Sequence, residues 1–184
     1  LYEEALTIAR DMGVCTVLHV LDPLINPASA SAQVLGVYSA ALVEPVAYTQ
    51  RALGLCQSFV VYGADGMDEL STTGVNKLSR LDEDGMVSTF SLDPADLALP
   101  RARLTDVAGG PPAVNVRITQ SVLAGKAGPP RDIAVLNAAA TLVVGNKARN
   151  LKEGISKAEE SIDSQSAARK LQELIDFTQQ ARDA

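Results

Sequence analysis

A short apolar run leads into a glycine-rich turn that carries three acidic side chains. The stretch Ser58–Glu69 reads SFVVYGADGMDE and ends on the adjacent carboxylates Asp68 and Glu69, with Asp65 three residues earlier. Open α/β sheets bind ligands at the carboxyl ends of their strands, and Mg²⁺ often binds one or two carboxylates together with phosphate and water. The acids therefore fit a magnesium site. They also fit an ordinary helix start, because acids are favourable at the positive end of the helix dipole, and spacing alone does not decide between the two.

Strands and helices alternate around this stretch, which indicates an α/β fold. Val34–Tyr38 and Ser58–Tyr62 are expected strands, separated by an expected helix over Val43–Leu53. The second strand is apolar over four consecutive residues, which fits a strand covered on both faces, as in a parallel or mixed sheet. Val75–Leu81 and Met86–Leu92 flank the polar loop DEDG and predict a β-hairpin.

Helices dominate the C-terminal part of the chain. Apolar residues recur at helical spacing in Ala113–Ala124 and in Arg131–Val144, and the second stretch is apolar nearly all round, as expected of a central buried helix. Asn150 is placed to cap a further helix, and a last helix is expected after Ser164. The expected apolar face of that last helix carries Ala167, Leu171, Leu174, Ile175 and Thr178. Two N-terminal elements are also expected, a helix over Tyr2–Met12 and a strand over Cys15–Leu21.

The composition is that of one globular domain with an aliphatic core. The chain has 184 residues, of which 47% are hydrophobic, 21% charged and 4% aromatic, and it has no Trp. A chain of this size buries roughly 70% of its unfolded surface. No linker, repeat or low-complexity segment divides it. Residues 1–184 are therefore expected to form a single α/β domain, a mixed central sheet flanked by helices.

Charge and cysteine content narrow the classes of partner and compartment. The net charge of −6 argues against nucleic acid or an anionic membrane as a partner. No apolar run approaches the ~20 residues that span a bilayer. No charged segment followed by an apolar one marks a secretory signal. The two cysteines, Cys15 and Cys56, are expected to be reduced and buried, which predicts a cytoplasmic protein.

Several catalytic and nucleotide-binding motifs are missing from the sequence. There is no GxGxxG fingerprint and no GxSxG elbow, and Gly125-Lys126 lacks the Ser or Thr and the first Gly of a phosphate-binding P-loop. His19 is the only histidine and lies in an apolar run, where a packing role is expected. Neither a catalytic triad nor a zinc site is predicted, and no catalytic residue is assigned.

A series of motifs resembles, in order, the anthranilate phosphoribosyltransferases. The loop LDPLINPA (Leu21–Ala28) is similar to the family's LGPLxNPA, and VVYGADGMDELS (Val60–Ser71) is similar to its VVHGxDGLDE. Further similarities cover nearly the whole chain and comprise QVLGVYS (Gln33–Ser39), DPADLAL (Asp93–Leu99), Ala108–Gly110, RDIAVLNAAATL (Arg131–Leu142) and LKEG (Leu151–Gly154). The resemblance implies the phosphoribosyltransferase fold, which the pyrimidine nucleoside phosphorylases share.

The resemblance also implies a reaction and its site residues. Family members are glycosyltransferases of tryptophan biosynthesis that transfer phosphoribose from Mg²⁺-bound phosphoribosyl pyrophosphate to the amine of anthranilate, releasing pyrophosphate. Asp68 and Glu69 match the family's metal-binding pair and would hold Mg²⁺ against the diphosphate, so that the ion neutralises the leaving group. The family's anthranilate-binding Arg falls on Ala9. Arg10, one position away, is the substrate-binding candidate.

Departures from the family pattern limit what the chain is expected to do alone. The family's GTGGD diphosphate loop, KHGN segment, metal-ligating Ser and N-terminal helical dimerisation domain would all lie before Leu1. The resemblance therefore predicts an incomplete catalytic domain that is inactive by itself and monomeric, whereas the family is homodimeric. Gln165 replaces a family Gly, which is strained if that backbone needs a positive φ. The alternatives are a nucleoside phosphorylase-like enzyme of the same fold and a non-catalytic remnant that acts as a binding module.

Overall fold

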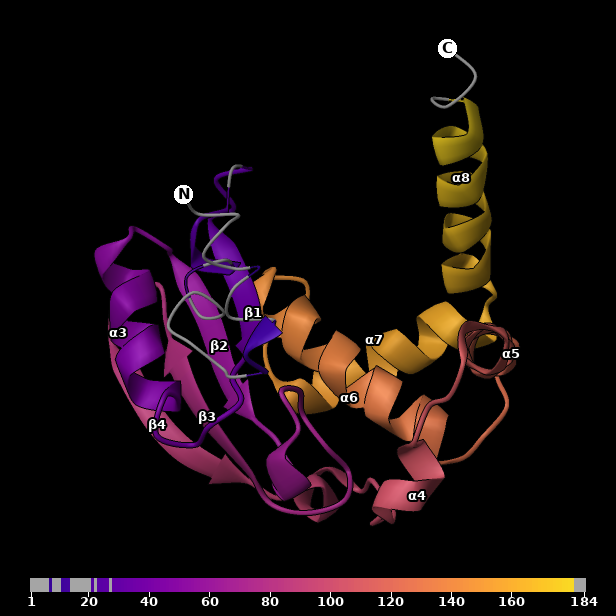
Figure 1. The fold of residues 1–184 in the computed structure, drawn as a ribbon, viewed down its shortest axis with the longest axis horizontal. Helices are drawn as coiled ribbons and strands as arrows, with labels where there is room; N and C mark the ends of the chain where they lie inside the picture. The colour runs from indigo at the N-terminus through magenta and orange to yellow at the C-terminus, as the bar shows by residue number, and fades with distance from the viewer. Residues whose placement is uncertain (1–6, 8–10, 14–20, 22, 27, 181–184) are drawn as a thin grey trace.

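Four strands form one mixed sheet with helices on both of its faces (Figure 1). This computed structural model describes residue 7 and residues 11–13, 21, 23–26 and 28–180. The strands lie in the order β1-β2-β3-β4 and are β1 (Ala32–Gly36), β2 (Gln57–Tyr62), β3 (Asn76–Leu81) and β4 (Val87–Leu92). β1 and β2 are parallel, whereas β2–β3 and β3–β4 are antiparallel. The predicted α/β fold with a mixed sheet and a hairpin is confirmed.

Helix α3 (Val43–Ala52) connects the two parallel strands and covers one face of the sheet. The apolar cluster on this face comprises Leu35, Val37, Val43, Val46, Ala47 and Val60. Phe59 and Val61 belong to the cluster on the opposite face, because successive side chains of a strand point to opposite sides. β2 is thus covered on both faces, which explains its uninterrupted apolar run.

Helices α6 (Pro129–Val144) and α7 (Leu151–Asp163) cover the second face of the sheet. The buried residues of α6 lie along one broad side, and they are Val135, Leu136, Ala139, Ala140, Val143 and Val144. Ala134 and Ala138 are exposed, so α6 is buried on one side and not nearly all round as its sequence suggests. Asn150 caps α7 as predicted, because its side-chain oxygen accepts from the N–H of Glu153 at 3.0 Å.

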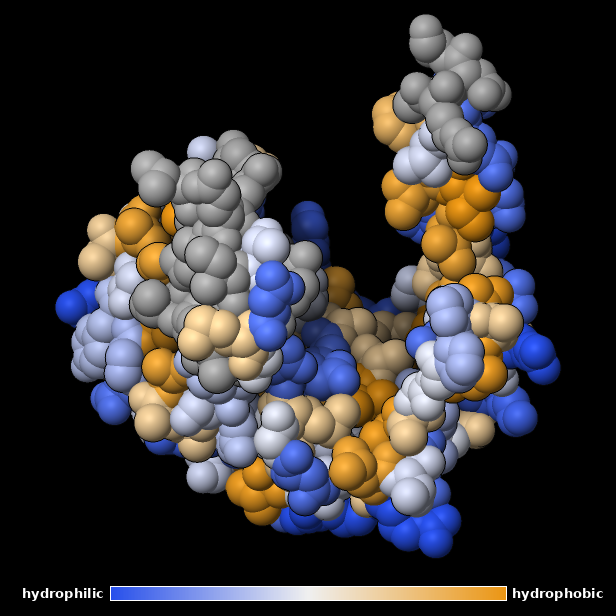
Figure 2. All heavy atoms as spheres, in the orientation of Figure 1, coloured by the Kyte–Doolittle hydropathy of each residue, from blue (hydrophilic) through white to orange (hydrophobic). Residues whose placement is uncertain are grey.

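Two further helices lie beside this layer, and a third extends away from it. α4 (Leu104–Val107) and α5 (Pro112–Leu123) lie beside α6. α8 (Ser166–Gln180) extends away from the layer, with its base beside α5 and α7 (Figure 1). The predicted helix is confirmed, but much of its apolar side is exposed, as the stripe in Figure 2 shows. The exposed residues of that stripe are Leu171, Leu174, Ile175 and Phe177.

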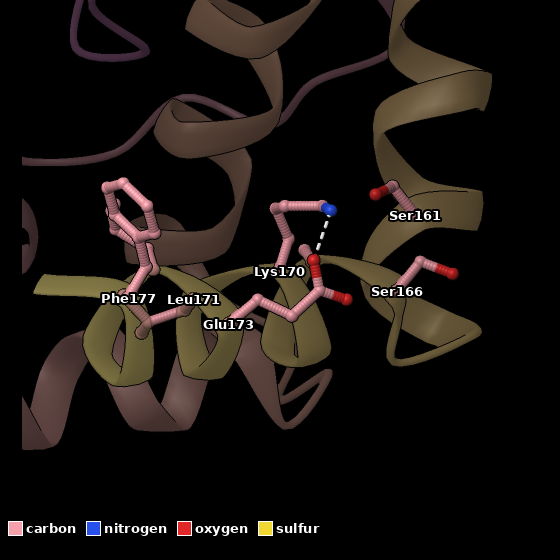
Figure 3. A pocket seen from close by; sticks show the side chains of 8 residues that line it. Ser161, Ser166, Lys170, Leu171, Glu173 and Phe177 are labelled. Atoms are coloured by element: carbon pink, nitrogen blue, oxygen red, sulfur yellow. Dashed lines mark hydrogen bonds and ion pairs between the residues drawn. The ribbon is translucent and has the colours of Figure 1, made fainter. Parts of the chain in front are cut away.

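The end of α7 and the base of α8 border an open hollow (Figure 3). Ser161 and Ser166 lie on one side of it, and Leu171 and Phe177 belong to its lining as well. The two charged side chains of the lining, Lys170 and Glu173, pair with each other. The hollow therefore presents mainly apolar surface and no uncompensated charge.

One expectation about the cysteines is wrong, and several others cannot be compared with the structure. Cys56 is exposed, because it lies in the turn before β2 and burial begins only with the next residue, Gln57. Cys15 and His19 lie outside the described residues, as does most of the two elements expected over 2–12 and 15–21. None of the helices in the described part of the chain has the length and apolar character of a membrane span.

Candidate functional site

The acidic stretch lies in a loop that follows β2. The chain first forms a short 3-10 turn, Ala64–Gly66, in which Asp65 has a left-handed φ of 59°. Across this turn the N–H of Gly63 donates to the carbonyl of Met67 at 2.7 Å. From Asp68 to the start of β3 the backbone is not helical. The acids therefore do not begin a helix, and that alternative is wrong.

Two glycines allow the backbone of the carboxylate pair to approach the ends of the parallel strands. A Cβ atom at Gly36, the last residue of β1, would lie 1.5 Å from the carbonyl oxygen of Asp68. A Cβ atom at Gly63, just after β2, would lie 2.2 Å from the carbonyl oxygen of Glu69. No side chain fits at either position. The pair thus lies against the carboxyl ends of β1 and β2, the edge at which open α/β sheets bind ligands.

The residues that follow the pair are held by two asparagines. Leu70 is fully buried, and its N–H donates to Oδ1 of Asn137 at 3.0 Å while its carbonyl accepts from Nδ2 at 2.7 Å. Nδ2 of Asn137 also donates to the carbonyl of Ile133, one turn earlier in α6, at 3.0 Å. Asn76 makes the same kind of paired contact with the backbone of Ser71, at 2.7 and 2.9 Å. The loop backbone is therefore fixed even though it has no partner strand.

The two carboxylates are exposed, and no positive charge in the described part of the chain compensates them. No ion pair joins Asp68 or Glu69 to a described side chain. Partial burial raises the pKa of Glu69, and the neighbouring charge of Asp68 raises it further. Burial and the charge of Asp68 both make the ionised form of Glu69 less favourable. A divalent cation bound by the two carboxylates offsets both effects.

The donor set fits a magnesium ion that is shared with a substrate. Within residues 28–180 and the other described positions, no three His, Cys, Asp or Glu side chains are grouped so that they could hold a metal. Asp65 therefore does not join Asp68 and Glu69 in a three-carboxylate site. Two carboxylates are nevertheless the share that proteins commonly contribute to Mg²⁺, when phosphate oxygens and water complete its shell.

Sequence reasoning found the carboxylates but missed the residues that hold them. Asn137, Gly36 and Gly63 were each visible in the sequence as exceptions to their surroundings. A side-chain amide in an otherwise apolar helix needs hydrogen-bond partners, and a glycine at a strand end often marks a close backbone approach. Arg10 and Ala9 lie outside the described residues, so the anthranilate-binding position stays a prediction.

The family profile and the similar curated sequences point to the same family. Residues 2–168 match the sequence profile of the glycosyl transferase family, a/b domain. Anthranilate phosphoribosyltransferases from Clostridium kluyveri and Syntrophobacter fumaroxidans are 43% and 44% identical to this chain over 170 and 169 residues. Each of these matches covers 92% of this chain and 50% of the relative. The chain thus spans about half the length of the curated relatives that it matches.

Solved structures show the same relationship. The anthranilate phosphoribosyltransferase of Thermus thermophilus superposes with a TM-score of 0.85 at 34% identity, covering 93% of this chain and 50% of that one. The enzyme from Saccharomyces cerevisiae in complex with PRPP and Mg superposes with a TM-score of 0.82 at 35% identity, covering 92% of this chain and 49% of that one. By its sequence and its fold, this chain belongs to the glycosyl transferase family, within the a/b domain.

Proposed function

We propose that this chain supplies the metal-binding part of an anthranilate phosphoribosyltransferase. The observation that carries the proposal is the placement of two adjacent residues with exposed carboxylates, Asp68 and Glu69, whose backbone lies against the carboxyl ends of the parallel strands β1 and β2. The Saccharomyces cerevisiae relative in complex with PRPP and Mg supports a diphosphate substrate together with magnesium. The proposed enzyme is a cytoplasmic glycosyltransferase of tryptophan biosynthesis, and its proposed substrates are phosphoribosyl pyrophosphate and anthranilate.

The role proposed for the chain's own residues is positional and electrostatic. Asp68 and Glu69 would each offer carboxylate oxygens to Mg²⁺, with diphosphate oxygens and water in the remaining positions. Bound there, the ion would supply positive charge that stabilises a departing diphosphate. The close approaches at Gly36 and Gly63 and the contacts of Leu70 keep the two carboxylates at this edge of the sheet.

The acceptor half of the reaction is not assigned to described residues. Arg10 remains the candidate for binding anthranilate. Because the chain spans about half the length of its relatives, we expect the isolated chain to leave anthranilate unconsumed in the presence of phosphoribosyl pyrophosphate and Mg²⁺. The fluorescence of anthranilate reports this directly. Its loss on addition of the purified chain would contradict the expectation of inactivity.

The metal-binding proposal is tested by titrating the chain with Mn²⁺, a paramagnetic stand-in for Mg²⁺ whose free ion is followed by electron paramagnetic resonance. The wild-type chain should bind Mn²⁺, and inorganic pyrophosphate should strengthen that binding. The double variant Asp68→Asn plus Glu69→Gln should lose it. Asp65→Asn is the matched control, because it removes a carboxylate from the same loop and Asn tolerates the left-handed backbone of that position. Equal Mn²⁺ binding by the wild-type chain and the double variant would exclude the proposed site.

A further inference from the structure

We infer that Asn137 is a positioning residue for the Asp68–Glu69 carboxylate pair, an inference that rests on the function proposed above. Asn137 lies in α6, 67 residues from Leu70 in the sequence. Its side chain nevertheless bonds both backbone groups of Leu70, the residue that directly follows Glu69. The contact joins the helical layer to the loop that carries the carboxylates.

The side-chain amide of Asn137 is suited to binding the loop backbone and not to packing in an apolar core. The helix around it is apolar, with Leu136 and Ala140 fully buried. Asn lowers helix propensity, so an aliphatic residue would suit the helix itself better. Its amide can accept and donate at once, and here it accepts one hydrogen bond and donates two. A side-chain amide has the acceptor and the donor that pairing with the N–H and the carbonyl of one residue requires.

The contact matters because Leu70 is buried outside any strand. A buried backbone N–H or carbonyl without a partner is costly, so the loop would shift if the amide were removed. The carbonyl of Met67 is held by Gly63, and both backbone groups of Leu70 are held by Asn137. Asp68 and Glu69 are the two residues between these anchors. Their backbone is thus fixed on both sides, and this determines where the two carboxylate side chains lie.

Replacing a residue that holds a metal ligand in place without itself touching the metal commonly changes metal affinity by about 10- to 100-fold. The variant Asn137→Leu keeps a side chain of similar size in α6 and removes all three hydrogen bonds. We expect it to weaken Mn²⁺ binding by about tenfold. Amide hydrogen exchange at Leu70 should become faster at the same time, and this second readout does not require a metal.

A control separates positioning from general destabilisation. Asn146 follows α6, and its amide bonds the side chains of Gln57 and Glu83. Gln57 is the first residue of β2, whereas the carboxylate loop follows the last residue of that strand. Asn146 has a left-handed φ of 55°, so Asn146→Gly removes its amide without adding backbone strain. This variant should lower the unfolding temperature and leave both Mn²⁺ affinity and Leu70 exchange at their wild-type values.

The outcomes of this comparison distinguish a failure of the positioning role of Asn137 from a failure of the proposed metal site. A tenfold weaker Mn²⁺ affinity in Asn137→Leu alone, with faster Leu70 exchange, supports the positioning role. Wild-type affinity in Asn137→Leu overturns the inference but leaves the metal site in place if the double variant at Asp68 and Glu69 has lost its binding. Equal losses of affinity in Asn137→Leu and Asn146→Gly also overturn it, because general destabilisation then accounts for both. Mn²⁺ binding that is indifferent to Asp68 and Glu69 overturns the proposed function and the inference together.

Discussion

Gly36 and Asp68 meet so closely that the carbonyl oxygen of Asp68 lies 1.5 Å from the place where a Cβ atom at position 36 would stand. The obstacle is backbone, which cannot rotate away as a side chain can. Gly36→Ala must therefore push the loop off the end of β1. We expect a loss of about 1–3 kcal/mol in the free energy of unfolding, the usual cost of overpacking, and weaker Mn²⁺ binding. Urea denaturation and Mn²⁺ titration measure the two effects.

Gly85→Ala is the control for this substitution. Nothing lies within 4 Å of a Cβ at Gly85, but its φ of 77° makes any side chain there strained. This variant should also lose stability, by about 1 kcal/mol, through strain alone. Its Mn²⁺ affinity should equal that of the wild-type chain. If Gly36→Ala retained full Mn²⁺ affinity, the close approach of the loop to β1 would not be needed for the site.

The raised pKa of Glu69 gives a second prediction. Partial burial is its larger cause and the charge of Asp68 the smaller one. Asp68→Asn removes only the smaller cause, so the pKa of Glu69 should fall and yet stay above the usual value for a glutamate. Carbon-13 NMR of the Glu69 carboxyl group as a function of pH measures this directly. An unchanged pKa of Glu69 would mean that the two carboxylates do not interact electrostatically.

The fold was largely predictable because its signals are local. The uninterrupted apolar run of β2 predicts a strand covered on both faces, and Asn150 predicts the start of α7 by its capping chemistry. The exposure of apolar side chains was harder to predict. Leu171 and Leu174 lie on the expected apolar side of α8, but a helical pattern shows only that a side is apolar and not whether another element covers it.

The sequence predicts the acidic residues of the site, but it does not predict which residues hold their backbone in place. Asp68 and Glu69 are adjacent in the sequence, so their pairing needs no tertiary information. The contact of Asn137 with Leu70 and the approach of Asp68 to Gly36 join residues that are distant in the chain. No sequence periodicity encodes such a pair. Asn137 signals only that its amide needs a partner, and the fold decides which partner it finds.

Gln165 gives a prediction in which strain and hydrogen bonding compete. Its φ is 61°, so the left-handed backbone that a glycine would suit is present at this position. Against this, its side-chain nitrogen donates to the carbonyls of Leu123 and Ile162 at 3.0 and 3.2 Å. Left-handed strain costs roughly 1–2 kcal/mol. One of the two hydrogen bonds is exposed and the other only partly buried, so water competes for both and their net contribution to stability is small. Gln165→Gly should therefore raise the free energy of unfolding by up to about 1 kcal/mol.

The variant Gln165→Ala separates the two effects. It loses the hydrogen bonds and keeps the strain, so it should be less stable than the wild-type chain. The expected order of stability in urea is the Gly variant, then the wild-type chain, then the Ala variant. A Gly variant less stable than the wild-type chain would show that the contacts with Leu123 and Ile162 outweigh the strain.

Glu153 makes the stability of α7 depend on pH. Hydrogen bonds from Arg149 and Lys157 lower the pKa of its carboxyl group from the usual 4.5 to about 2. A carboxyl group whose pKa is lower in the folded state binds protons more readily when the chain unfolds. The resulting stabilisation is fully present above pH 4.5 and is lost as the pH falls from about 4.5 to about 2. The unfolding temperatures of wild-type and Glu153→Gln chains should therefore differ most near neutral pH and converge at the acidic end of this window.

Glu160→Gln on the same helix is the control, because Glu160 is exposed and forms no ion pair with a described residue. Its effect on the unfolding temperature should be small and should not change across the window. The partners of Glu153 are largely solvent-accessible, so salt should weaken the stabilisation as well. A constant difference between wild-type and Glu153→Gln chains from pH 7 down to the acidic limit would show that the carboxylate is not ionised preferentially in the folded chain.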